Sequence, residues 1–217
     1  RAGATTARAV GLIADDVTGV IETAGSFNVG SHLDVVGNIT SGSNLTVNGN
    51  FYSPGCIVQA TSENVHDIVS YAATTAATEI TPLNVVITPK FIGSKIQLQW
   101  MINYETHQDV VLLVYRKIGT GSVTKIGYNN TIADNVWNGI ATPNYETDYA
   151  STPNQTYLTW TDSPNTLEEV TYYVYYQTSN AASARYFYLN RTVSSTDTGQ
   201  AAYERMVSSK SAFEIAQ

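Results

Sequence analysis

Charged side chains are scarce in this sequence, where Asp, Glu, Lys and Arg together make up 13% of 217 residues. The usual share in a globular domain is about 25%. The 18 acidic residues outnumber the 11 basic ones, so the formal net charge is −7. This charge would repel a phosphate backbone, and we therefore expect no nucleic-acid partner.

Long apolar runs, cysteine pairs and metal-ligand spacings are also lacking. No stretch of about 18 apolar residues occurs, so we expect no membrane insertion. The single cysteine, Cys56, cannot form an intrachain disulfide. It is either a small apolar packing residue or a point where three copies meet near an axis. His32, His66 and His107 lie far apart in the sequence and lack the spacing of a metal site, so we expect neither a metal nor a cofactor.

Catalytic signatures are missing as well. The sequence contains no Gly-x-Ser-x-Gly motif, no phosphate-binding loop and no Cys-x-x-Cys pair, which removes the commonest nucleophile and redox motifs. The adjacent acids Asp15–Asp16 and Glu168–Glu169 would point to opposite faces of a strand, a poor arrangement for a glycosidase pair. We therefore expect that the chain is not an enzyme, with a glycan hydrolase as a minor third possibility.

A six-residue repeat runs from Gly19 to Pro54, and every unit begins with Gly or Ser. Positions three and five of a unit lie two residues apart, so on a strand their side chains point the same way. The small first residue suits a corner where the backbone turns. Short strands joined by corners at fixed spacing are typical of a β-helix or β-prism. The third positions are Ile21, Phe27, Leu33, Ile39, Leu45 and Phe51.

The number of repeats favours three intertwined chains over one. Six units would give a single-chain β-helix only about two coils, fewer than the roughly three that a solenoid needs to bury a core. If three chains wind together, six layers at ~4.8 Å form a stalk roughly 29 Å long. The third-position side chains then lie on the trimer axis. The alternative is a set of ordinary short strands in a globular domain.

The sequence divides into three parts. Residues 1–18 are rich in Ala and Thr and are predicted to be an entry segment. Residues 19–55 are the predicted trimeric stalk, which ends at the breaker Pro54–Gly55. Residues 56–217 are the predicted head. Because residue 1 is Arg and not Met, we interpret it as an internal or processed point of a longer product.

The predicted head is all-β. Apolar and polar residues alternate over 96–102 and 170–177, while 110–115 is nearly continuously apolar. Alternation indicates strands with one buried face, and the continuous run indicates a strand covered on both faces. Further strand segments occur at 186–189 and 212–215, with turn clusters between them. This spacing favours a β-sandwich, of jelly-roll type.

Several sequence segments resemble structural proteins of tailed phages. The first part resembles the shafts of tail fibres and related virion proteins, of cyanobacterial phages above all, in the segments Gly11–Ile21, Gly37–Thr40 and Asn44–Asn50. The head resembles a C-terminal domain of such proteins in the segments Cys56–Gln59, Leu83–Pro89, Gly93–Ile96 and Ser211–Ala216. The resemblance implies a homotrimer located in the virion, bound to other virion proteins through its N-terminal end. Residues 119–165 lie outside the resemblance.

The segment from Tyr128 to Trp160 is the predicted ligand-binding region. It contains several aromatic residues, many Asn, three acids and no Lys, Arg or His. Aromatic faces stack on the C–H faces of sugars, and Asn and Asp pair with their hydroxyls. Alternatively, the rings pack the loop onto the sandwich or form a trimer contact. The candidate residues are Asp134, Asn135, Trp137, Asn138, Tyr145 and Tyr149.

These observations together predict a phage tail-fibre segment that attaches the virion to the host surface, through a cell-surface glycan. The alternative is a structural virion protein, such as a head fibre or a capsid-decorating protein, that has no receptor of its own. The stalk and the head do not distinguish these two functions. The position of the protein on the particle would do so.

Overall fold

We analysed a computed structural model of the chain, which describes residues 40–44, 53–106, 109–127, 139–141, 151–181, 185–195 and 204–217. The chain divides into two compact units, residues 1–49 and 50–217. The predicted entry segment lies outside the described residues, and so do all six predicted axis residues, Ile21, Phe27, Leu33, Ile39, Leu45 and Phe51. The stalk, its trimer axis and the three-part division of the chain therefore stay predictions.

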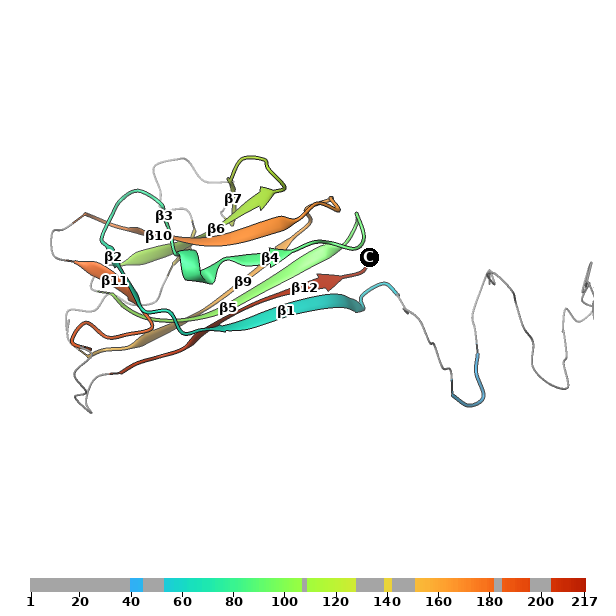
Figure 1. Cartoon of the computed structure of the whole chain (residues 1–217), viewed down its shortest axis with the longest axis horizontal. Coiled ribbons are helices and arrows are strands. Elements are labelled where there is room, and N and C mark those ends of the chain that lie inside the picture. Colours follow the sequence, from blue (N-terminus) through green and yellow to red (C-terminus); the bar gives the residue numbers. More distant parts are fainter. Residues whose placement is uncertain are drawn as a thin grey trace, which may run out of the picture. The chain divides into compact units, whose positions relative to one another are not determined.

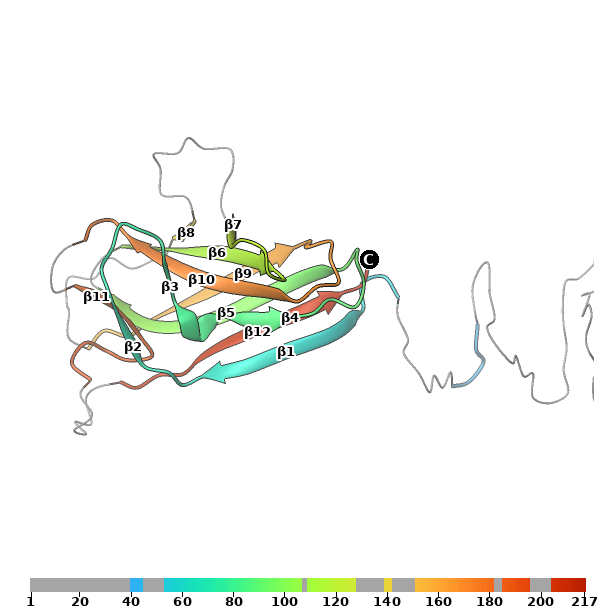
Figure 2. The same cartoon turned by 45° about the horizontal axis from the view of Figure 1, so that its top comes forward.

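The described residues form strands almost throughout, with one short 3-10 helix, η1, at Thr81–Leu83. Figure 1 shows the strands in two layers, and Figure 2 shows the same layers from a second direction. The strands are β1 Ile57–Val65, β2 Val69–Ala72, β3 Thr78–Glu79, β4 Val85–Ile87, β5 Lys95–Thr106, β6 Val110–Ile118, β7 Thr124–Gly127, β8 Ile140–Ala141, β9 Asn154–Asp162, β10 Val170–Thr178, β11 Tyr186–Leu189 and β12 Ser208–Ile215.

The strands pair in two antiparallel sheets. In sheet A the order is β1–β12–β5–β9, and β11 continues along β5 beyond β12 and pairs with β2. In sheet B, β3 and β4 share one edge of β10, followed by β6, whose other edge carries β7 and β8. With consecutive short strands taken together, successive strands interleave between the sheets as in a jelly roll. For the described residues, the predicted all-β class and the predicted β-sandwich head are confirmed.

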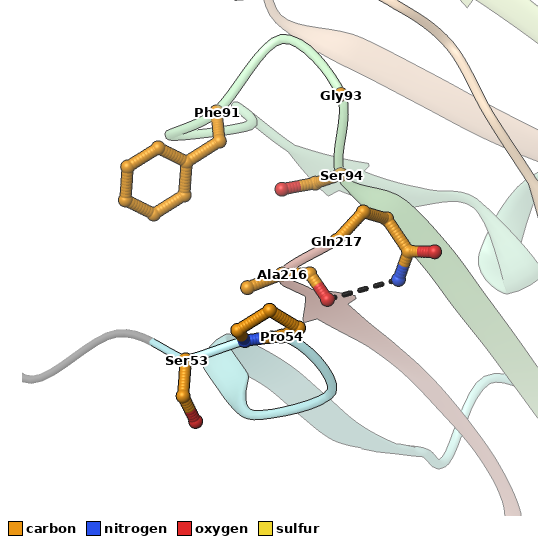
Figure 3. A pocket seen from close by; sticks show the side chains of 7 residues that line it. All are labelled: Ser53, Pro54, Phe91, Gly93, Ser94, Ala216 and Gln217. Carbon is orange, nitrogen blue, oxygen red and sulfur yellow. Dashed lines mark hydrogen bonds between the residues drawn. The ribbon is translucent and has the colours of Figure 1, made fainter. Parts of the chain in front are cut away.

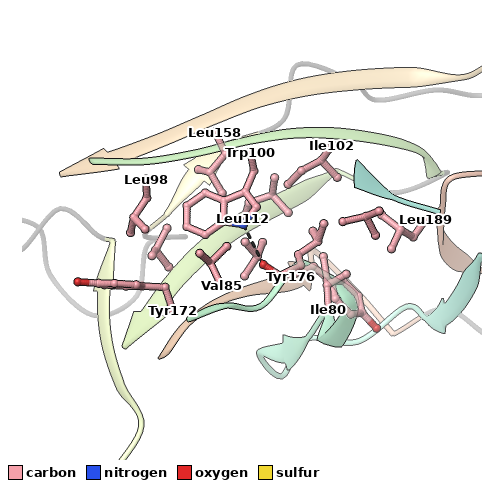
Figure 4. Close-up of a cluster of buried hydrophobic side chains, with 14 of the residues drawn as sticks. Ile80, Val85, Leu98, Trp100, Ile102, Leu112, Leu158, Tyr172, Tyr176 and Leu189 are labelled. Carbon is pink, nitrogen blue, oxygen red and sulfur yellow. Dashed lines mark hydrogen bonds between the residues drawn. The ribbon is translucent and has the colours of Figure 1, made fainter. Parts of the chain in front are cut away.

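The core lies between the sheets and follows from the period-two pattern. Along β5 the residues Ile96, Leu98, Trp100, Ile102 and Tyr104 are all fully buried, because alternate side chains of a strand share one face. The opposite wall comes from β10, and Figure 4 shows Tyr172 and Tyr176 of that strand in the same buried cluster as Trp100 of β5. The indole of Trp100 donates to the carbonyl of Leu83 at 2.8 Å, so its one polar atom is paired inside the core.

The strand β6 is covered on both faces, as its continuous apolar run predicted. Val110, Leu112 and Val114 belong to the core between the sheets. Val111 and Leu113 point the other way, yet they are only 4% and 1% exposed. Residue 139 lies against both, and a Cβ there would meet each side chain at 2.4 Å. Only glycine fits at such a close approach.

A polar tie joins the two sheets. Asp162 on β9 accepts two hydrogen bonds of 2.9 Å from the guanidinium of Arg116 on β6. The hydroxyl of Tyr172 on β10 donates to the same carboxylate at 2.8 Å. The two side chains of the ion pair are only 22% and 10% exposed. Burial, followed by the nearby Asp162, raises the pKa of Tyr172, so its hydroxyl keeps the proton that it donates.

One end of the sandwich, here called the base end, is formed by residues 53–56, 88–94, 163–169 and 216–217. The entry turn is fixed there by hydrogen bonds from the Gly55 amide to the Ala216 carbonyl, 2.8 Å, and from the Ala216 amide to the Cys56 carbonyl, 3.0 Å. The sulfur of Cys56, which is half-buried, accepts from the Ser53 amide at 3.3 Å. Cys56 thus has a structural contact within this turn.

Candidate functional site

The predicted ligand-binding residues Asp134, Asn135, Trp137, Asn138, Tyr145 and Tyr149 lie outside the described residues. Their role stays a prediction. The structure describes two other aromatic residues of the same segment, and they differ. Trp160 is partly buried and packs against the core, as the packing alternative expected. Tyr157 is 64% exposed and points out from sheet A.

The residue just before the candidate segment, Gly127, and two described residues within it, Gly139 and Thr152, are held against the sandwich. At Gly127 an added Cβ would meet Val114 Cβ at 2.7 Å, and Gly139 approaches the same strand. Further along, the amide and hydroxyl of Thr152 donate to Glu105 at 3.1 and 3.0 Å. Glu105 is fully buried and also accepts from the Val193 amide. Gly127 on β7 and Gly139 just before β8 both lie against β6.

On that outer face lies a group of aromatic side chains, here called the tyrosine face: Tyr115 on β6 with Tyr173 and Tyr175 on β10. The rings of Tyr115 and Tyr175 have centroids 4.2 Å apart at 33°, and those of Tyr173 and Tyr175 are 6.4 Å apart at 74°. All three rings are half-buried. The register pairs Tyr115 with Tyr173 across the two strands, which brings aromatic residues far apart in sequence onto one surface.

Polar groups border the tyrosine face. The carboxylate of Glu79, on β3, accepts from the Asn84 amide at 2.7 Å and makes a long 3.5 Å contact with the Tyr175 hydroxyl. Lys125 pairs in register with Tyr115 on the opposite side, and burial lowers the pKa of this lysine. The face therefore carries donors and acceptors at its edges around an aromatic centre.

Two of the tyrosines of this face, Tyr115 and Tyr175, keep their protons near physiological pH. Burial raises the pKa of Tyr115. Burial, and then the neighbouring Glu79, raises that of Tyr175. A protonated phenol can donate a hydrogen bond while its ring stacks on an apolar surface. Stacking together with carboxylate, amide and phenol partners is the chemistry that a neutral sugar requires.

Sequence reasoning identified the strand but not this face. The alternation over 170–177 predicts that Tyr173 and Tyr175 point away from the core, and this is confirmed. The sequence does not show that Tyr115 and Glu79 lie beside them, because both contacts depend on the pairing register of β10 with β6 and β3. The density of tyrosine in β10 was the available signal.

The described residues do not form a metal-binding site. Within these ranges no group of three or more His, Cys, Asp or Glu side chains could hold a metal ion. His66 is exposed, whereas His32 and His107 lie outside the described residues. No helix of the part that the structure describes is long and apolar enough to cross a membrane.

Comparison with known proteins leaves the family open. No family model matches the chain, and no curated protein matches it. Solved structures with some likeness include a VP2 subviral particle of infectious bursal disease virus, with a TM-score of 0.40 and 9% identity, covering 73% of this chain and 32% of that one. A structure of the Gx strain of the same virus has a TM-score of 0.36 and 12% identity, and the match covers 73% of this chain and 41% of that one.

The chain therefore spans less than half the length of these viral chains. Because both the identity and the TM-score are low, the likeness assigns neither a family nor a function to the chain.

Proposed function

We propose that the chain is a structural protein of a tailed-phage virion. It is the distal segment of a homotrimeric tail fibre, and its head attaches the virion to a neutral glycan on the host surface. The sequence segments that resemble phage structural proteins support the virion role, and the six-residue repeat supports the trimer. The tyrosine face carries the glycan assignment. Other virion proteins bind at the N-terminal end, and the head binds its glycan without catalysing a reaction.

The tyrosine face suits a sugar in shape and in charge. The rings of Tyr115, Tyr173 and Tyr175 offer an apolar surface to the C–H face of a pyranose. Glu79 accepts from sugar hydroxyls with the carboxylate that also holds Asn84. The candidate residues Trp137 and Tyr145, which lie outside the described residues, are proposed to belong to the same binding region. One such site binds weakly, and three heads on one fibre raise the effective affinity through multivalency.

The test compares two tyrosine substitutions in the full chain. Tyr173→Ala should reduce glycan-array signal and host-cell adsorption about thirtyfold per site, because truncating an aromatic anchor costs about 2 kcal/mol. Tyr186→Ala is the matched control, because Tyr186 is an exposed tyrosine on β11 of sheet A, outside the candidate segment. It should bind like the parent. Both variants should melt within a few degrees of the parent. Unchanged binding in Tyr173→Ala, or a loss confined to Tyr186→Ala, would contradict the assignment.

A second function is favoured by the outer face of sheet A. The outward residues of β5 between Lys95 and Glu105 are Gln97, Gln99, Met101 and Asn103. Those of β9 and β12 are likewise uncharged. Depletion of charge is a mark of interface cores. A capsid-decorating protein or head fibre could use this face against neighbouring virion proteins. Imaging of assembled particles distinguishes the two functions, since density over capsomers supports decoration and density at the tail supports attachment.

A further inference from the structure

The base end of the head exposes large apolar side chains on a well-held loop. Phe91 and Ile92, at the tip of loop 88–94, are 38% and 65% exposed. Ile57, at the start of β1, is 61% exposed and pairs in register with Ile215 on β12. Apolar groups kept in water at one end of a domain indicate a surface that another molecule covers.

A buried carboxylate fixes this loop. Glu214, on β12, is fully buried, and its two oxygens accept from the Lys90 amide at 2.9 and 3.0 Å. The Phe91 amide donates to it at 3.0 Å. Gln59 donates both to Glu214 and to the Thr88 carbonyl, each at 2.6 Å. A carboxylate is costly to bury unless it is fully hydrogen-bonded, and here the donors are largely the loop's own backbone.

The consequence of this clamp is a pre-organised tip. Ordering a loop on binding reduces affinity, so a loop that is already rigid loses less entropy when it docks. Ile92 therefore stands in water on a loop whose shape is set before any partner arrives. The clamp thus holds Ile92 in an exposed position, where its side chain is not part of the core of its own head.

Beside the tip lies a hollow of ≈ 200 Å³. Figure 3 shows its walls, with the Phe91 ring on one side and Pro54, Ala216 and Gln217 on the other. Ser53 and Pro54 are positions five and six of the last unit of the six-residue repeat. The end of the predicted stalk is thus itself a wall of this hollow, and the Gly55–Ala216 hydrogen bond fixes it there.

We propose that the base end is the contact between heads in the trimer, in which the Ile92 tip of one copy enters the Pro54–Ala216 hollow of the next. Each copy has both the projection and the hollow at the same end. Three copies that share a stalk would place their base ends around one axis. A projection-into-hollow contact is heterologous, and it closes into a ring under threefold symmetry. Lys90 on loop 88–94 and Lys95 at the start of β5, with Glu168 and Glu169 before β10, give the rim charges of both signs.

This inference rests on the trimer of the proposed function, and cysteine cross-linking tests it separately. In a Cys56→Ser background, the full chain carries Ile92→Cys together with Gln217→Cys, both exposed positions. Oxidation should link neighbouring chains into covalent dimers and trimers. The matched control pairs Gln217→Cys with Ile68→Cys, a 45% exposed residue at the opposite end of the sandwich. The control should stay unlinked.

Light scattering on the same samples separates the outcomes. Trimers that show the Ile92–Gln217 link between chains, with an unlinked control, support the interface. Trimers that show no interchain link, or a link only within each chain, overturn the interface and leave the trimer intact. Monomers under native conditions overturn the trimer itself, and the interface with it.

Discussion

Replacing Glu214 should weaken the head more than its single carboxylate suggests. Glu214→Ala leaves the Lys90 and Phe91 amides without their acceptor and removes one of the two acceptors of the Gln59 side chain. Hydrogen bonds to a charged group contribute about 1.5–3 kcal/mol each, and water entering at the exposed loop recovers part of the loss. We therefore expect about 3–5 kcal/mol of lost unfolding free energy. For a domain of this size that is a Tm decrease of roughly 6–20 °C.

The pH dependence gives a sharper form of the same prediction. Burial alone would raise the pKa of Glu214, but the hydrogen bonds that its carboxylate accepts, from the Lys90 and Phe91 amides and from Gln59, outweigh burial and hold the pKa below its ordinary value of 4.5. A carboxyl with a lowered pKa in the folded state stabilises the fold above pH 4.5. That contribution is lost as the pH falls through the lower, folded-state pKa.

The isosteric variant Glu214→Gln isolates the stability that the charge of the carboxylate contributes. It should melt several degrees below the parent at pH 7, and the difference should shrink in acid, as followed by circular dichroism from pH 7 to 3. Glu63→Gln is the control, because Glu63 is 66% exposed in its ion pair with Lys210. Exposed pairs contribute about 0–1 kcal/mol. Equal Tm values for Glu214→Gln and the parent at every pH would refute the reasoning.

Three further predictions address the sheet tie, the stalk and the binding segment. Asp162→Ala leaves Arg116 charged and unpaired between the sheets, so urea unfolding should show a loss of about 3–5 kcal/mol; a loss under 1 kcal/mol would contradict the tie. Ile39→Asp should bring three carboxylates near one axis and abolish the trimer in light scattering, and an intact trimer would contradict the stalk. Trp137→Ala and Tyr145→Ala should each weaken host-cell adsorption about thirtyfold at unchanged Tm, and normal adsorption by both would favour the decoration alternative.

The sandwich was predictable because the sequences of its long strands show which of their side chains are buried. The alternation along β5 and β10 and the continuous run in β6 each translate directly into faces, since side chains of a strand alternate with period two. Short strands such as β3 and β8, with two residues each, have no such pattern. They form because a neighbouring strand offers them free backbone groups.

The candidate surfaces depend on register, which the sequence does not encode locally. Tyr115 joins the tyrosine face only because β6 pairs with β10 in one particular alignment. Glu214 holds Lys90 and Phe91, which are more than a hundred residues earlier in the chain. Its acid type in an otherwise apolar strand end was a visible signal, but its partners were not. The residues of the predicted glycan segment stay untested.

The pairing of β1 with β12 has a consequence for synthesis. β1 hydrogen-bonds to β12 alone within the described sheets, from Ile57 opposite Ile215 to Val65 opposite Ser208. At about 5–20 residues per second, the ribosome needs roughly 7–30 s to make the intervening chain. During that time β1 has no native partner. Non-local pairing of this kind slows folding and exposes strand edges to aggregation. We therefore expect β1 to join sheet A only after the β12 segment has been synthesised.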